Sequence, residues 1–241
     1  MRAWLSACMG RGVNSTNADS SRAKVPRATP LILAAGLAGG MAMVARSIGI
    51  DGPFAVDHAV RGQVHRCVPQ RTRAVLAPLF LVGLPGGYIT IAYGAAWWLR
   101  RRGRAGGPAI VTSAWLGWLV HRGVKLVYRR ERPRIPRVRR RMDSYPSGHT
   151  TGATALAVTT ALVLRRNGLV SPASAAAIAV GAPLVMGAYR VIDDEHWATD
   201  VLGGWLLGSS IALVSDAVLG SARGPAIRRG RRTAAGRAAR A

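Results

Sequence analysis

The chain has 241 residues, of which 49% are hydrophobic and 18% charged, and its 34 Lys and Arg against 10 Asp and Glu give a formal net charge of +24. This hydrophobic fraction excludes a disordered chain, and a count of only two cysteines excludes a disulfide-rich scaffold. The charged residues are unevenly distributed, because several stretches long enough to cross a bilayer contain none of them.

Six uncharged stretches predict an all-α integral membrane protein. They occupy residues 29–45, 74–99, 105–120, 144–164, 167–189 and 201–215. The apolar core of a bilayer is about 30 Å thick and needs roughly 20 apolar residues in a helix. The sequence therefore predicts a bundle of six transmembrane helices near 29–48, 75–98, 106–127, 147–165, 168–188 and 199–219. Pro85, Gly86 and Gly87 interrupt the second of these helices and predict a kink there.

The remaining segments predict two tails and one surface helix. Residues 1–28 are polar and residues 221–241 are rich in Arg, Ala and Gly, so we expect disordered tails on either side of a membrane domain at 29–220. Between the first two spans, residues 53–72 mix apolar and polar side chains, which predicts a short helix at the membrane interface.

The basic residues predict an orientation in the membrane. Eighteen of them lie in the two tails and in the loops after the second and fourth spans, and fifteen lie on the other side, ten of these within 122–141. The ten basic residues within 122–141 are left out of this count if they bind a ligand. The positive-inside rule then places both termini in the cytoplasm and the 122–141 and 189–200 loops outside.

The same basic residues indicate which partners to expect. Basic segments beside a membrane attract anionic lipid headgroups, and no nucleic-acid-binding module accompanies them here. We therefore expect membrane lipids and no nucleic acid as partners, and the sequence predicts no particular oligomeric state.

Three groups of polar residues fall where the predicted helices reach the outer surface: Lys125 with Arg132 and Pro133, the segment 145–149, and Arg190 with His196 and Asp200. The guanidinium group is a planar fork suited to binding oxyanions through two hydrogen bonds. Lys125, Arg132 and Arg190 together therefore indicate a receptor for a phosphate-like anion.

The second group, at 145–149, indicates a helix start that faces the same anion. Ser147 is a good N-cap residue, and Gly148 allows a ligand to approach the backbone closely. The first amides of the following helix can then point at the anion, with the helix dipole behind them. This helix start holds His149 at the edge of the site.

The third group supplies a reactive imidazole. His196 and Asp200 are four residues apart, which places them on one face of a helix. The Asp can accept a proton from one ring nitrogen and leave the other nitrogen as a nucleophile, while His149 protonates the departing oxygen. This combination suits phosphoryl transfer. The alternative is a metal site built from His196, Asp200, Asp193, Asp194 and Glu195, which the ten nearby basic residues disfavour.

These groups resemble the three-part signature of the type 2 phosphatidic acid phosphatase superfamily. Lys125 and Arg132-Pro133 match its Lys, six residues, Arg-Pro, and residues 146–149 match its Pro-Ser-Gly-His. Arg190, His196 and Asp200 keep the spacing of the third part, in which Tyr189 replaces the family's Ser and changes the local hydrogen bonding. The resemblance implies a membrane phosphatase acting on a lipid phosphate or polyprenyl pyrophosphate.

The resemblance also implies a role for each matched residue. His196 would form a phosphohistidine, Asp200 would orient it, and His149 would act as general acid. The phosphate would be bound, without a metal or other cofactor, by Lys125, Arg132, Arg190, Ser147 and Gly148. The arginines at 134 and 137–141 fall outside the motif, so we expect a solvated basic loop, with recognition of a second phosphate or a lipid headgroup as the alternative.

Two other functions stay open at this stage. A phosphotransferase would use the same phosphohistidine but pass the phosphoryl group to an alcohol, and a binding or scaffold protein would keep the fold without turnover. A haloperoxidase, another activity of this superfamily, is disfavoured because those relatives are usually soluble.

Overall fold

The computed structural model describes residues 28–48, 53–133 and 143–222. Within these ranges the chain forms helices and no strand; the only extended pairing is an isolated bridge between Arg130 and Asp143. The helices are α1 (Ala28–Ile48), α2 (Ala55–Cys67), α3 (Gln70–Leu76), α4 (Pro78–Gly83), α5 (Pro85–Arg101), α6 (Gly107–Val127), α7 (Gly148–Arg166), α8 (Pro172–Ile192) and α9 (Ala198–Leu219). The all-α prediction is confirmed for the described residues.

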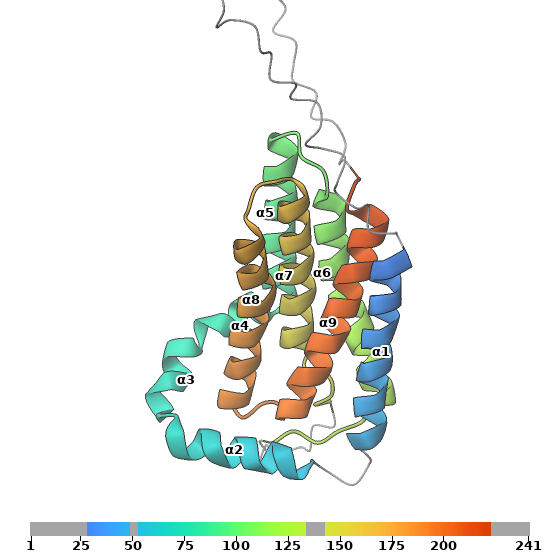
Figure 1. Cartoon of the computed structure of the whole chain (residues 1–241). Coiled ribbons are helices and arrows are strands. Elements are labelled where there is room, and N and C mark those ends of the chain that lie inside the picture. Colours follow the sequence, from blue (N-terminus) through green and yellow to red (C-terminus); the bar gives the residue numbers. More distant parts are fainter. Residues whose placement is uncertain (1–27, 49–52, 134–142, 223–241) are drawn as a thin grey trace, which may run out of the picture.

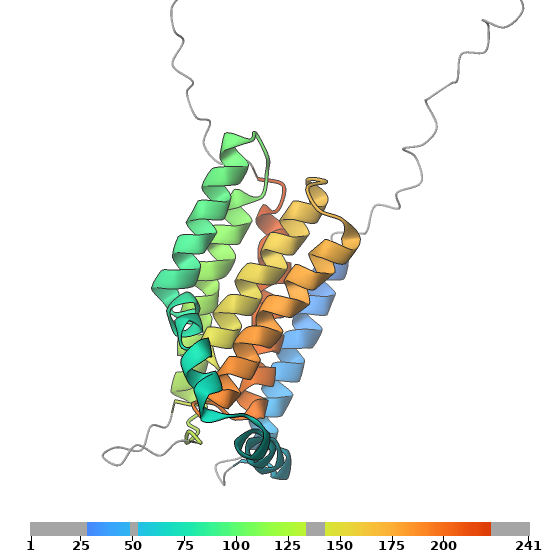
Figure 2. The same cartoon turned by 90° about the vertical axis from the view of Figure 1, so that its left-hand side faces the viewer.

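The long helices form one bundle, and α2 lies across one of its ends (Figure 1). Helix α7 packs against α6, α8 and α9, while α1 packs against α9 and α5 against α6. Helix α1 begins, and α9 ends, at the end of the bundle that lies opposite α2 (Figure 1). The view turned by 90° also shows α2 at its own end of the bundle, where it is seen nearly along its axis (Figure 2). One end of the molecule therefore carries α2 and the loops that precede α7 and α9.

Three helices, α1, α8 and α9, are long and apolar enough to cross a membrane. The central helix α7 is more polar because it faces other helices on most of its surface. Two of its buried threonines satisfy their hydroxyls locally: Thr151 donates to the carbonyl of Ser147 at 2.8 Å, and Thr154 donates to the carbonyl of Thr150 at 2.7 Å. Small and hydroxyl-bearing residues of this kind allow close helix packing in membranes.

The second predicted span is divided into α4 and α5. The break lies at Leu84, whose backbone is extended, and Pro85 is the first residue of α5. Proline fits the first turn of a helix but interrupts one that runs through it, because it lacks the backbone N–H. The break directs α4 toward the start of α7, where Gly83 meets His149.

Residues 53–72, predicted as a surface helix, form α2 and the start of α3. Helix α2 faces the bundle with Asp57, which is 1% exposed, whereas Val56 is 53% exposed. The predicted tails at 1–28 and 221–241 lie outside the described residues except for Ala28, Ser221 and Ala222, and so do the arginines at 134 and 137–141.

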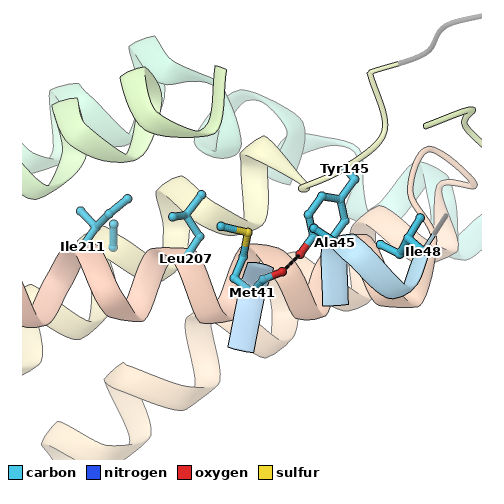
Figure 3. Close-up of a cluster of buried hydrophobic side chains, with 7 residues drawn as sticks. Met41, Ala45, Ile48, Tyr145, Leu207 and Ile211 are labelled. Atoms are coloured by element: carbon cyan, nitrogen blue, oxygen red, sulfur yellow. Dashed lines mark hydrogen bonds between the residues drawn. The ribbon is translucent and has the colours of Figure 1, made fainter. Parts of the chain in front are cut away.

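A buried apolar cluster joins α1 and α9 to the segment before α7 (Figure 3). Met41 and Ala45 of α1 pack in one cluster with Leu207 and Ile211 of α9 and with Tyr145. The Tyr145 hydroxyl donates to the backbone carbonyl of Met41 at 2.8 Å. This cluster fixes the approach of the chain to the N-terminus of α7, where Ser147, Gly148 and His149 lie.

Candidate active site

The three predicted motifs meet at the end of the bundle that carries α2. They border one cavity of about 760 Å³, which also has apolar walls from α4, α5 and α6. Six of the eight predicted site residues line it: Lys125 near the end of α6, Arg132 in the next loop, Gly148 and His149 at the start of α7, Arg190 near the end of α8, and His196 in the loop before α9. Ser147 and Asp200 stand behind this lining.

His196 is buried, with 3% of its surface exposed, between the cavity and Asp200. Its Nε2 lies 3.5 Å from an Nη1 of Arg132, and its Nδ1 lies 3.4 Å from Oδ2 of Asp200 without hydrogen-bond alignment. Burial, together with the positive charges of Lys125, Arg132 and Arg190, lowers the pKa of His196 well below its ordinary value. The imidazole is therefore neutral near pH 7, as a nitrogen nucleophile must be.

Asp200 is fully buried behind His196 and is held by several donors. Its Oδ2 accepts hydrogen bonds from the Ser144 hydroxyl and, at 2.9 Å, from the Trp197 amide, while its Oδ1 accepts one from Arg130 at 2.6 Å. These contacts leave Oδ2 directed toward the Nδ1 side of His196. The arrangement can select the tautomer that leaves Nε2 unprotonated.

Arg132 and Arg190 converge on one carboxylate oxygen, which belongs to Glu195. Oε2 of Glu195 lies 2.8 Å from Nη1 of Arg132 and 3.7 Å from Nη2 of Arg190. Arg132 also forms a two-bond pair with Asp143, at 2.9 and 3.1 Å. Burial by itself lowers the pKa of Arg132, but the hydrogen bond and charge of Asp143, together with the charges of Glu195 and Asp200, outweigh burial and leave this pKa raised. Arg132 thus stays charged beside His196, and the two guanidinium groups together form a position that holds an oxyanion.

The other predicted phosphate-binding residues occupy different places. Lys125 donates from Nζ to the backbone carbonyl of Asp143. Ser147 is the N-cap residue of α7, as predicted, but its buried hydroxyl accepts from Thr150 Oγ1 at 2.9 Å and does not line the cavity. Gly148 does line it, and a Cβ at this position would lie 2.6 Å from Nε2 of His121.

His149 is positioned mainly by α4. Its ring lies 5.3 Å from the ring of Phe80, measured between centroids, and a Cβ at Gly83 would lie 2.2 Å from its Cδ2. Its Nε2 is buried, with no hydrogen-bond partner among the described residues. A buried nitrogen of this kind at a cavity wall suits a group that exchanges a proton with a bound molecule.

Tyr189, which stands at the family's Ser position, lies beneath Arg190. The guanidinium carbon of Arg190 is 5.4 Å from the centroid of the Tyr189 ring. This cation–π contact supports the guanidinium group by stacking, where a Ser hydroxyl would do so by hydrogen bonding.

The acidic residues considered above as metal ligands each form an ion pair with an arginine. Asp194 pairs with Arg61 through two bonds of 2.7 and 2.8 Å, and Glu195 pairs with Arg132. Among the described residues no group of three or more His, Cys, Asp and Glu side chains is arranged to hold a metal ion. The acidic residues at 193–195 therefore balance the arginines of the site.

Sequence reasoning missed three residues at this site: Asp57, Arg130 and His121. Arg130 and Asp57 are buried and hydrogen-bonded beside Asp200, and His121 lines the cavity one helical turn before Lys125. The spacing of His121 and Lys125 on α6 was the available signal for the histidine. No comparable signal separates Arg130 from its neighbour Arg129.

Comparison with known proteins supports this fold. Residues 105–220, which contain all three motifs, match the family model of the PAP2 superfamily. No curated protein matches the sequence of the chain.

Two solved structures share the fold. One is a transmembrane PAP2-type phosphatidylglycerolphosphate phosphatase from Bacillus subtilis, which is 20% identical to this chain. The match has a TM-score of 0.63 and covers 76% of this chain and 94% of that one. The other is LpxE from Aquifex aeolicus, with 19% identity, a TM-score of 0.53, and coverage of 69% and 98%. Together with the three membrane-length helices, the transmembrane neighbour supports an integral membrane protein.

Proposed function

We propose that this chain is a membrane phosphatase that hydrolyses a lipid phosphate or polyprenyl pyrophosphate through a phosphohistidine on His196, without a metal ion. The observation that carries the proposal is the single oxyanion position between Arg132 and Arg190, occupied by the Glu195 carboxylate, next to Nε2 of His196. A phosphate oxygen that displaces this carboxylate would bring its phosphorus within reach of the nucleophile.

The first step forms the phosphohistidine. Nε2 of His196 attacks phosphorus in line, the bond from phosphorus to the leaving oxygen breaks, and His149 gives its proton to that oxygen. The imidazole becomes positively charged as it is phosphorylated, and Asp200 stabilises that charge through Nδ1–H. Lys125, Arg132 and Arg190, with the Gly148 amide, stabilise the charge that spreads over the equatorial phosphoryl oxygens.

The second step regenerates the enzyme. Water attacks phosphorus, His149 accepts the proton of that water, and the bond from phosphorus to Nε2 of His196 breaks to release inorganic phosphate. Fixed guanidinium and ammonium groups carry out the charge stabilisation that Mg²⁺ provides in other phosphoryl-transfer enzymes. Ser147 supports the site indirectly in this scheme, by holding the start of α7.

The proposed substrate enters from the membrane. The cavity wall next to the charged residues is apolar, with Phe80 and Leu84 at the α4–α5 break and Trp118 and Leu126 on α6. A lipid could leave its hydrocarbon chain in the bilayer and present its phosphate along this wall. A site at the interface also avoids the cost of about 2.5–3.5 kcal/mol for a charged side chain at the bilayer centre.

The proposed topology has six membrane crossings, by α1, the α4–α5 pair, α6, α7, α8 and α9, in a membrane domain at residues 29–220. Both termini would be cytoplasmic and the active site would face outward. The bundle supports this proposal, because α1 begins and α9 ends opposite the motifs (Figure 1).

The test is release of inorganic phosphate by the purified protein from a panel of lipids, with a chelator present. The panel would contain phosphatidic acid, phosphatidylglycerol phosphate and a polyprenyl pyrophosphate, and His196→Ala would be the control. We expect chelator-resistant release from at least one lipid and none from the variant. Loss of activity with the chelator, or activity that survives in His196→Ala, would contradict the proposal.

The same assay separates the hydrolase from a phosphotransferase. A hydrolase accumulates free phosphate in the absence of any alcohol acceptor. An obligate transferase releases none until an alcohol is added, and the phosphorylated alcohol is then its product.

A further inference from the structure

Helix α2 is attached to the candidate active site through a buried carboxylate. Asp57 projects from the first turn of α2 toward the start of α9, which lies 142 residues later in the chain. Its Oδ1 accepts the Thr199 amide N–H at 2.9 Å, and its Oδ2 accepts the Thr199 hydroxyl at 2.8 Å. Asp57 therefore caps the N-terminus of α9 from a different helix, as it also does for its own helix through the Phe54 amide at 3.2 Å.

Arg130 bridges Asp57 and Asp200. This guanidinium group is 4% exposed and donates from Nη2 to Asp57 and from Nη1 to Asp200, both at 2.6 Å. Its Nη1 also donates to the Thr199 hydroxyl at 2.7 Å. One planar cation thus fixes two carboxylates and the first turn of α9, a geometry that a lysine cannot reproduce.

The bridge determines which oxygen of Asp200 faces His196. Arg130 binds Oδ1, so Oδ2 is left for the Trp197 amide, the Ser144 hydroxyl and the side of Nδ1 of His196. Without Arg130, Oδ1 would lose its donor, and only the two hydrogen bonds to Oδ2 would hold the carboxylate in this orientation. The imidazole it orients would then lose its fixed direction toward the cavity.

The bridge also sets the charge behind the nucleophile. Two carboxylates and one guanidinium group leave one net negative charge in a buried region beside His196. This negative charge offsets part of the positive charge of Lys125, Arg132 and Arg190 around His196, and it favours the positive charge that the imidazole acquires during attack on phosphorus. Asp57 contributes to it although it touches neither His196 nor the cavity lining.

We propose that Arg130 and Asp57 are positioning residues for phosphoryl transfer, which act through Asp200 to direct and stabilise His196. The inference rests on the proposed function, because it assigns roles within that same site. A second contact supports it: Arg61, one turn after Asp57 on α2, holds Asp194 in the loop that leads to His196. Helix α2 thereby contacts the loop that carries His196 on both sides, through Arg61 at Asp194 and through Asp57 at Thr199.

The test compares Arg130→Lys and Asp57→Asn with Arg166→Gln, using the purified full-length protein. Arg166→Gln is the matched control, because it removes an arginine ion pair, to Asp216, at the opposite end of the bundle. For each protein we would measure kcat and KM on a short-chain lipid phosphate, inhibition by inorganic phosphate, and the folded fraction by thermal unfolding.

We expect kcat per folded protein to fall by roughly 100-fold in Arg130→Lys and roughly 10-fold in Asp57→Asn, because small displacements of a catalytic group have effects of this size. KM and the inhibition constant of phosphate should stay within about threefold, since Lys125, Arg132 and Arg190 are unchanged. The control Arg166→Gln should match the wild-type protein in kcat per folded protein, in KM and in the inhibition constant of phosphate. A purely structural role would lower the unfolding temperature without lowering kcat per folded protein.

Equal kcat per folded protein in wild type and both variants would overturn the inference while leaving the proposed function intact. A loss of phosphate affinity that parallels the loss of kcat would also overturn it, because Arg130 would then be a phosphate ligand. If Arg130→Lys does not fold, Asp57→Asn alone decides between these results. A wild-type protein inactive on every lipid phosphate would overturn the proposed function and the inference with it.

Discussion

Gly83 lies so close to His149 that a single methyl group should displace the proposed general acid. A Cβ at position 83 would be 2.2 Å from Cδ2 of His149, whereas carbon atoms in contact are separated by about 3.5–4.0 Å. The imidazole of a Gly83→Ala variant must therefore move by about 1 Å or more. A displacement of 1 Å in a catalytic group can reduce the rate about 100-fold.

We expect Gly83→Ala to reduce kcat for phosphate release by about this factor of roughly 100 while KM changes little, because the cations that bind phosphate lie on α6, α8 and the loop at Arg132. Gly86→Ala is the matched control. It makes the same chemical change three residues later, where a Cβ would meet no atom within 4 Å. This control should retain the wild-type kcat.

A double variant makes the test sharper. In a His149→Ala background the added methyl group at position 83 has no imidazole to displace, so Gly83→Ala should lower kcat little further. Equal kcat values for Gly83→Ala and Gly86→Ala, or an undiminished effect of Gly83→Ala in the double variant, would refute the reasoning.

Three further predictions concern other contacts at the same end of the bundle. Glu195→Gln should tighten inhibition by inorganic phosphate roughly tenfold, since phosphate no longer competes with a carboxylate for Arg132; unchanged or weaker inhibition would contradict this. Asp194→Asn should lower stability by about 1 kcal/mol or less at pH 7. The pKa of Asp194 is lowered because the hydrogen bond and charge of Arg61 outweigh the opposing effect of burial, so its stabilisation is present above the ordinary pKa of 3.8 and is lost as the pH falls through the lower folded value. The difference in thermal unfolding between wild type and variant should therefore be full at pH 7 and shrink as the pH falls below 3.8, and a difference that does not change with pH would count against the ion pair. Tyr145→Phe should lower stability by about 1 kcal/mol through loss of the bond to Met41, and an unchanged unfolding temperature would argue against that bond.

Hydropathy placed the long helices well because a bilayer imposes length and apolarity on any segment that crosses it. The predicted 29–48 and 199–219 agree with α1 and α9 to within one residue. Prediction was weaker for 75–98, where Pro85 divides the segment into α4 and α5. The pattern there indicated a kink, but not that the break would bring Gly83 against His149, since that contact depends on how α4 packs on α7.

The motif residues that line the cavity could be predicted because each lies at a helix end or in the loop next to one, and these positions follow from the spans. Arg130 and Asp57 could not be predicted in the same way. Arg129 and Arg130 are identical in sequence terms, yet Arg130 is buried because the chain after α6 turns its side chain toward Asp200. Asp57 lies in a segment predicted only as a surface helix, and the packing of α2 against α9 is what buries its side chain.

The central claim is that His196 carries the phosphoryl group during turnover. The most direct measurement is to mix the protein with a lipid phosphate labelled at phosphorus, quench in alkali, in which phosphohistidine is stable, and locate the label by peptide mass spectrometry. We predict label on His196 in the wild-type protein. Label on another residue, or turnover with no labelled protein at any time point, would contradict the account.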